Sequence, residues 1–316
     1  MQDFLFSYDD IHLRPKHSAL GSRADADTSI TFLGHKFNLP VVPANMEDVI
    51  GRSSAEFLSA NGYFYIYHRF GTRLAVQSFV QMANDEKWKL ISASIGVGAN
   101  SLAILDDIRN DDYRVDFWTV DVAHADHENV RPIVSFIKRE FPSTKIIAGN
   151  VATYEGYRFL CDLGVDAVKV GIGGGSICST RYKTGFHVPT AYSIRDCVTY
   201  GDRNVPIIAD GGATHYGDVA KALVLGADMV MSGRWFAECI DSPAKIHNGK
   251  KIYRGSTSFE SKGHNNHVEG HTLEITEGCT YSERLTEIQQ ALRSSISYAG
   301  GRDLSAFNNV SWRLNR

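Results

Sequence analysis

The chain has 316 residues, of which 43% are hydrophobic, and a formal net charge of −3 at pH 7. This length and hydrophobic content suffice for a large buried core, whereas the charge excludes the basic surfaces that bind nucleic acids or anionic membranes. No basic segment followed by an apolar run opens the chain, and no apolar run approaches the ~20 residues that span a bilayer. The five cysteines form no Cys-x-x-Cys pair, so neither a zinc site nor a disulfide framework is indicated. We therefore expect a cytoplasmic location and no nucleic-acid or membrane partner.

Eight short apolar segments recur along the chain and are predicted to be buried parallel strands, because most are rich in β-branched residues and too short for helices. They span residues 39–44, 63–68, 89–95, 116–122, 144–150, 166–172, 205–212 and 227–233. Segments with helical periodicity lie between most of them, including 129–141, 153–164 and 215–226, and the last two end on Gly164 and Gly226. This alternation predicts a (β/α)8 TIM barrel as a single domain over residues 1–316. A doubly wound parallel sheet is the alternative.

Polar residues follow successive predicted strands at the point where each strand ends. In such barrels the active site lies at the carboxyl ends of the strands. The residues at these positions include Asn45, His68, Arg69, Ser94, Asp121, Asn150, Asp210 and Arg234. Any one of them alone is compatible with a helix cap or a turn. Their shared position after successive strands predicts a functional site at this end of the barrel.

The segment 170–185, VGIGGGSICSTRYKTG, is the most informative part of the sequence. Its glycines let the backbone approach a ligand closely and accept positive φ. Cys178 follows these glycines and is close in sequence to the hydroxyl of Thr180 and the cation of Arg181. A thiol beside backbone N–H groups and an arginine can have a lowered pKa and attack carbon. The alternative interpretation is a flexible glycine loop with an unreactive cysteine.

The last two strand ends predict a binding site for a nucleoside monophosphate. In this fold the loops after strands seven and eight commonly bind phosphate through backbone amides. Asp210 ends the seventh strand and is suited to accept hydrogen bonds from ribose hydroxyls. Gly211, Gly212 and Gly233 offer amides for the phosphate, and Arg234 adds a positive charge.

The sequence resembles the IMP dehydrogenase/GMP reductase family over nearly its whole length. The resembling segments are residues 8–15, 39–46, 121–124, 148–153, 171–186, 207–223, 253–258, 268–270 and 294–301. A glycine loop around an S-I-C-x-T core is highly diagnostic of that family. The resemblance implies a (β/α)8 barrel that assembles as a homotetramer. It also implies that Cys178 attacks C2 of a purine nucleotide and forms a covalent intermediate, a thioimidate, which exchanges hydride with a nicotinamide cofactor.

Three features favour the reductase reaction, in which NADPH converts GMP to IMP and ammonia. The segment 259–270 lacks the Arg-Tyr pair with which the dehydrogenases activate water, and residues 69–89 leave no room for their regulatory insert. The run R-Y-K-T-G-F after the nucleophile is also similar to that of the reductases. Oxidation of IMP or of another (deoxy)purine monophosphate is the alternative reaction. A non-catalytic purine nucleotide-binding paralogue is the third possibility.

The resemblance also implies roles for individual residues. Thr180 and Glu269 would together deliver the proton to the departing ammonia, with Glu269 on a mobile flap at about residues 256–280. Ser256, Thr257, Ser258 and Gly270 would contact phosphate or base, and Arg69, Ser94 and Asp121 would bind NADPH. The backbone carbonyls of Gly173, Gly175 and Cys178 match a site for a monovalent cation, K⁺. The sequence departs from the family at Arg234, where a small residue is usual, and at the histidines of 264–267.

Overall fold

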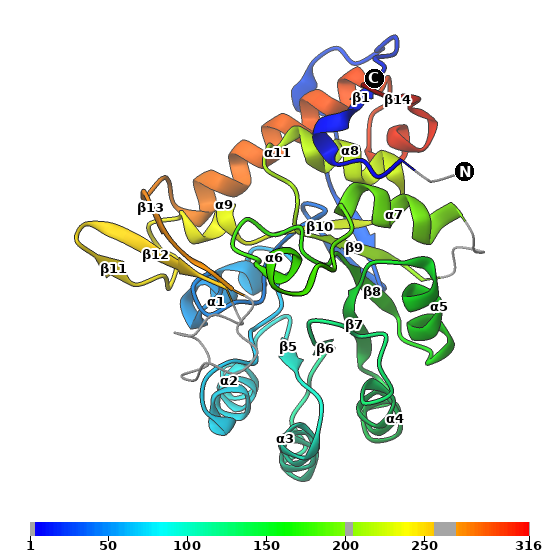
Figure 1. Cartoon of the computed structure of the whole chain (residues 1–316). Helices are drawn as coiled ribbons and strands as arrows, with labels where there is room; N and C mark the ends of the chain where they lie inside the picture. Colours follow the sequence, from blue (N-terminus) through cyan, green and yellow to red (C-terminus); the bar gives the residue numbers. More distant parts are fainter. Residues whose placement is uncertain (1–3, 200–204, 256–269, 316) are drawn as a thin grey trace.

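A computed structural model describes residues 4–199, 205–255 and 270–315 (Figure 1). At its centre lies a parallel sheet of seven strands in the order β4-β10-β9-β8-β7-β6-β5. The strands are β4 (Val41–Pro43), β5 (Ser92–Ile95), β6 (Phe117–Asp121), β7 (Lys145–Val151), β8 (Ala167–Val170), β9 (Ile207–Asp210) and β10 (Met229–Ser232). Each of these strands lies within one of the predicted apolar segments, except that β7 extends one residue beyond its segment, to Val151.

The remaining predicted strand, residues 63–68, lies beside β5. Tyr67 forms a parallel bridge with Ala93. Its backbone N–H donates to the carbonyl of Ser92 at 3.0 Å, and its carbonyl accepts from Ser94 at 2.8 Å. All eight predicted segments therefore contribute to one curled parallel sheet with helices around it, and the predicted (β/α)8 barrel is confirmed.

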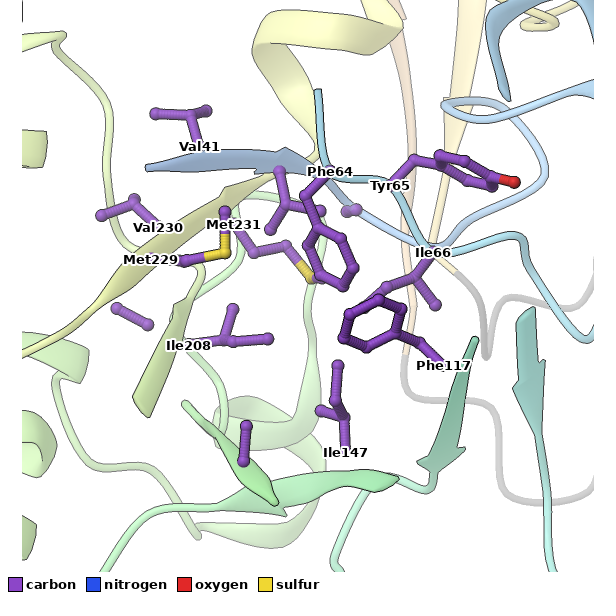
Figure 2. Packing of buried hydrophobic residues seen from close by; sticks show 14 of the residues in the cluster. Val41, Phe64, Tyr65, Ile66, Phe117, Ile147, Ile208, Met229, Val230 and Met231 are labelled. Atoms are coloured by element: carbon purple, nitrogen blue, oxygen red, sulfur yellow. The ribbon is translucent and has the colours of Figure 1, made fainter. Parts of the chain in front are cut away.

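Large apolar side chains fill the interior of the barrel. Phe64 and Phe117 meet there with ring centroids 5.1 Å apart (Figure 2). Phe32 and Phe37, from a hairpin of β2 (Ile30–Phe32) and β3 (His35–Phe37), pack against Phe64 at 5.6 and 5.1 Å. Because Phe117 begins β6, this hairpin covers the amino ends of the strands. The carboxyl ends are left for the functional site.

Helices surround the sheet, as the periodicity predicts (Figure 1). They are α1 (Arg52–Ala60), α2 (Arg73–Asp85), α3 (Ala99–Asn110), α4 (Val130–Glu140), α5 (Tyr154–Asp162), α7 (Thr190–Thr199), α8 (Gly217–Leu225) and α11 (Tyr281–Tyr298), with short α6 (Thr180–Thr184) and α9 (Arg234–Ala237). Thr153 caps α5 by accepting a hydrogen bond from the N–H of Gly156. Gly164 and Gly226 follow their helices with φ of 75° and 114°, which favours glycine. Within the described residues, no helix is both long and apolar enough to cross a membrane.

Several elements outside the barrel were not predicted. A three-stranded antiparallel sheet of β11 (Ile246–His247), β12 (Lys250–Arg254) and β13 (Thr272–Ile275) projects beside α1 and α9. Arg254 holds the end of β12 on the barrel, since its backbone N–H donates to Oδ2 of Asp48 at 2.8 Å. β1 (Ile11–Leu13) pairs with β14 (Trp312–Leu314), and three 3-10 helices, η1 (Tyr8–Asp10), η2 (Arg23–Asp25) and η3 (Leu304–Asn309), complete the described structure. Residues 256–269 of the predicted flap lie outside the described residues.

Candidate active site

The glycine-rich loop after β8 carries Cys178 at the mouth of the barrel. Its first glycine is sterically required, because a Cβ on Gly171 would lie 2.0 Å from the carbonyl oxygen of Asp210. The loop then turns on a hydrogen bond of 3.0 Å from the N–H of Cys178 to the carbonyl of Gly175. Cys178 also forms an antiparallel bridge with Gly270, just before β13. The loop that carries Cys178 is thus fixed both to the barrel and to the projecting sheet.

A cavity of about 210 Å³ opens beside this loop. The predicted site residues that line it are Arg69, Asp121, Gly175, Cys178, Thr180, Asp210, Gly211, Gly233 and Gly270. Within it, Sγ of Cys178 lies 3.2 Å from Oγ1 of Thr180. The thiol and the hydroxyl are therefore within hydrogen-bond distance of each other, next to the carboxyl ends of the barrel strands.

A second cavity of about 500 Å³ adjoins the first and shares Gly175, Gly211 and Gly233 with it. It contains the predicted phosphate residues Gly212 and Arg234. A Cβ on Gly233 would lie 2.0 Å from Oη of Tyr253, so a larger residue at this position would displace the Tyr253 side chain. Nε of Arg234 lies 2.9 Å from Oε1 of Glu238, and both side chains line this cavity.

The floor of the first cavity holds a buried lysine that sequence reasoning missed. Lys169 is 2% exposed, and its Nζ lies 3.0 Å from Oδ1 of Asp121 and 3.2 Å from Oδ2 of Asp210. Burial alone would raise the pKa of the Asp121 carboxyl, but the charges of Lys169 and Arg69 outweigh it and lower that pKa to about 2. The signal was present in the sequence, since a lysine within the apolar run 166–172 requires buried partners.

The chain is similar to known proteins over nearly its whole length. Residues 5–314 match the family described as "IMP dehydrogenase / GMP reductase domain". The chain belongs to this family. Proteins named GMP reductase from Helicobacter pylori (strain G27) and Enterococcus faecalis (strain ATCC 700802 / V583) are 41% and 40% identical to this chain. Each alignment covers 98% of this chain and 95% of the relative's length. One from Streptococcus pyogenes serotype M4 (strain MGAS10750) is 42% identical over 98% of this chain and 94% of its own.

The cofactor residues predicted from this family's pattern differ in their surroundings. Nε of Arg69 donates to the backbone carbonyl of Asp121 at 2.8 Å and lies 3.2 Å from its Oδ2, and the guanidinium covers the ring of Phe70. Ser94, by contrast, is completely buried, and its Oγ donates to the carbonyl of Tyr67 at 2.7 Å. Arg69 and Asp121 face the cavity, whereas Ser94 joins two strands of the barrel.

The other predicted positions divide between cavity and surroundings. Asn150 donates from Nδ2 to Oδ2 of Asp210 and to the carbonyl of Gly171, both at 2.8 Å. It thus fixes the Asp210 carboxylate, which is predicted to bind the ribose. Of the carbonyls predicted to bind a cation, that of Gly175 already accepts from Cys178, and Gly173 adjoins the ring of His187. Ser256, Thr257, Ser258 and Glu269 lie outside the described residues.

Proposed function

We propose that the protein is a GMP reductase, which uses NADPH to convert GMP to IMP and ammonia. The observation that carries the proposal is the Cys178–Thr180 pair, 3.2 Å apart, in a cavity of a chain that belongs to this family. The neighbouring Asp210 and the glycines of the second cavity support a nucleotide whose ribose and phosphate lie beside the thiol. The relatives named GMP reductase support the reductase over the dehydrogenase reaction.

The reaction proceeds through attack of the Cys178 sulfur on C2 of GMP. As the S–C2 bond forms, C2 becomes tetrahedral, and the C2–N bond to the amino group breaks once that group has been protonated. This protonation is needed because an amine leaves as ammonia and not as an amide ion. Thr180 and Glu269 deliver the proton. NADPH, when bound, supplies the hydride that forms the new C2–H bond. The S–C2 bond then breaks, its electron pair returns to Cys178, and IMP is released.

The described residues fit a nicotinamide cofactor. The first cavity continues at Arg69 and Val122 into a third cavity of about 370 Å³, which gives room for an extended molecule. Arg69 stands where the two cavities meet and supplies a cation for the 2′-phosphate that distinguishes NADPH from NADH. In the absence of a cofactor, this guanidinium pairs with Asp121. The same proposal includes a monovalent cation, K⁺, at the carbonyls of Gly173, Gly175 and Cys178, assembly as a homotetramer, and a cytoplasmic location.

A spectrophotometric panel tests the function. GMP, dGMP, IMP and XMP are each mixed with NADPH and, separately, with NAD⁺, and absorbance at the nicotinamide band is followed together with ammonia. We expect oxidation of NADPH and release of ammonia with GMP. Reduction of NAD⁺ by IMP would instead identify a dehydrogenase. Binding of purine monophosphates without any turnover would identify a non-catalytic paralogue.

A further inference from the structure

Lys169 lines the cavity floor, and the proposed reaction gives it no role. Its Nζ lies within 3.0 Å of Oδ1 of Asn45, in addition to the two carboxylates. A protonated lysine has three N–H donors and no acceptor. Three oxygen partners therefore use all three donors, and none is left for a ligand. Lys169 acts on the site through its neighbours.

The two carboxylates that Lys169 joins belong to opposite sides of the site. Oδ2 of Asp210 accepts from both Lys169 and Asn150, and among the described residues Oδ1 makes no hydrogen bond, so Oδ1 is the oxygen available to a ribose. Asp121 uses Oδ1 for Lys169 and Oδ2 for Arg69. One ammonium is thus the shared counter-ion of the nucleotide side and of the cofactor side.

We propose that Lys169 is a positioning residue through which nucleotide binding strengthens cofactor binding; this rests on the proposed function, in which both ligands occupy the site together. Ribose hydroxyls that donate to Asp210 reduce the attraction of its carboxylate for the ammonium. Lys169 then interacts more strongly with Asp121. Asp121 in turn holds Arg69 less tightly, and the guanidinium becomes available to an anionic group of the cofactor. Because coupling between two binding sites is reciprocal, the cofactor strengthens nucleotide binding by the same factor.

The coupling runs through charge and geometry and needs no proton transfer. Burial alone would lower the pKa of the Lys169 ammonium, but the charges of Asp121 and Asp210 outweigh it and raise that pKa. The ammonium therefore remains protonated at working pH. Asp121 remains ionised as well, because its pKa is about 2.

Calorimetric titration of NADP⁺ into the protein, free and saturated with IMP, measures the coupling without turnover. In the wild type we expect the NADP⁺ affinity to rise about fivefold or more with IMP, within the usual range of such couplings. In Lys169→Met the ratio should fall below about twofold. Lys251→Met is the matched control, since Lys251 is a second buried lysine, 1% exposed. Its partners among the described residues are backbone carbonyls, the Ser242 hydroxyl and, at 3.8 Å, the Glu277 carboxylate. This variant should keep the wild-type ratio.

Lys169→Arg covers the case in which Lys169→Met does not fold. Its guanidinium keeps the charge but presents donors in a plane, so we expect a folded protein with reduced coupling. A wild type without coupling, or a Lys169 variant that binds both ligands with the full ratio, would overturn the proposal. Turnover separates the two proposals. Oxidation of NADPH by GMP without coupling rejects the coupling alone, whereas coupled binding without turnover rejects the reaction alone.

Discussion

Two parts of the site hold ion pairs of nearly equal length in opposite surroundings. In the cavity floor, Lys169 lies 3.0 Å from Asp121, and the two side chains are 2% and 15% exposed. In the second cavity, which we propose to bind the phosphate and call the phosphate end, Arg234 lies 2.9 Å from Glu238, and these side chains are 57% and 22% exposed. Distance alone would rank the two pairs as equal.

The two ion pairs differ in interaction energy because they differ in exposure to solvent. Charges in the interior interact through a low effective dielectric constant and are hardly screened by salt, whereas exposed pairs are screened and contribute little. We therefore expect substitutions near the floor to have large effects that salt does not alter. Substitutions at the phosphate end should have small effects. Added salt should cause changes of similar size in the wild-type protein.

Replacement of the nucleophile should abolish turnover. In Cys178→Ser the hydroxyl cannot form the covalent intermediate at a useful rate, but the cavity keeps its shape, so nucleotide binding should persist. Oxidation of NADPH and calorimetry with GMP measure the two properties. Cys161→Ala is the control, because Cys161 is half-buried on α5 and burial raises the pKa of its thiol. Retained turnover in Cys178→Ser would refute the mechanism.

Glu269→Gln should slow ammonia release about 10²–10⁴-fold with little change in GMP affinity, because glutamine keeps the size of glutamate but cannot relay a proton. Thr180→Ala should cost a similar factor. If the two residues act as one unit, the double variant should be little slower than either single variant. Single-turnover oxidation of NADPH is the assay. Near-wild-type turnover in Glu269→Gln would make His264 or His267 the next candidates for proton transfer.

Asp210→Ala should raise the KM for GMP about ten- to a hundredfold, since a hydrogen bond to a charged group contributes about 1.5–3 kcal/mol. The side chain is 21% exposed, so the increase should be nearly the same at low and high salt. Comparison of GMP with dGMP on both proteins tests the contact with the ribose. A variant that loses equal affinity for both nucleotides would place the contact at the hydroxyl that they share.

The barrel could be predicted because its strands are buried on both faces and therefore appear as continuous apolar runs. All eight predicted segments contribute to the sheet. The predicted residues Cys178, Thr180, Arg69, Asp121 and Asp210 also come together around one cavity. Here the position of each residue after a strand was sufficient, because parallel strands bring their carboxyl ends to one side of the barrel.

The parts that could not be predicted lack such a pattern. β12 contains Lys250, Lys251 and Arg254, and its neighbour β11 has only two residues, so neither segment resembles an apolar strand. Lys169 lies within an apolar run, which signals that its ammonium needs buried partners but does not identify them. Its charged partners come from β6 and β9, and only the folded barrel brings these strands beside it.

The smallest effect is expected for Arg234→Ser. An exposed ion pair or phosphate contact contributes about 0.2–1 kcal/mol, so the KM for GMP should rise at most about fivefold. Added salt should produce a similar rise in the wild type and little further rise in the variant. Arg158→Ser is the matched control, because Arg158 pairs with Asp162 at the same i,i+4 spacing, at 2.9 Å and 59% exposure, on α5 away from both cavities. It should leave the KM unchanged. A rise of a hundredfold in Arg234→Ser, insensitive to salt, would mean that bound nucleotide excludes water from the phosphate end, and the contrast between the two regions would then hold only for the free protein.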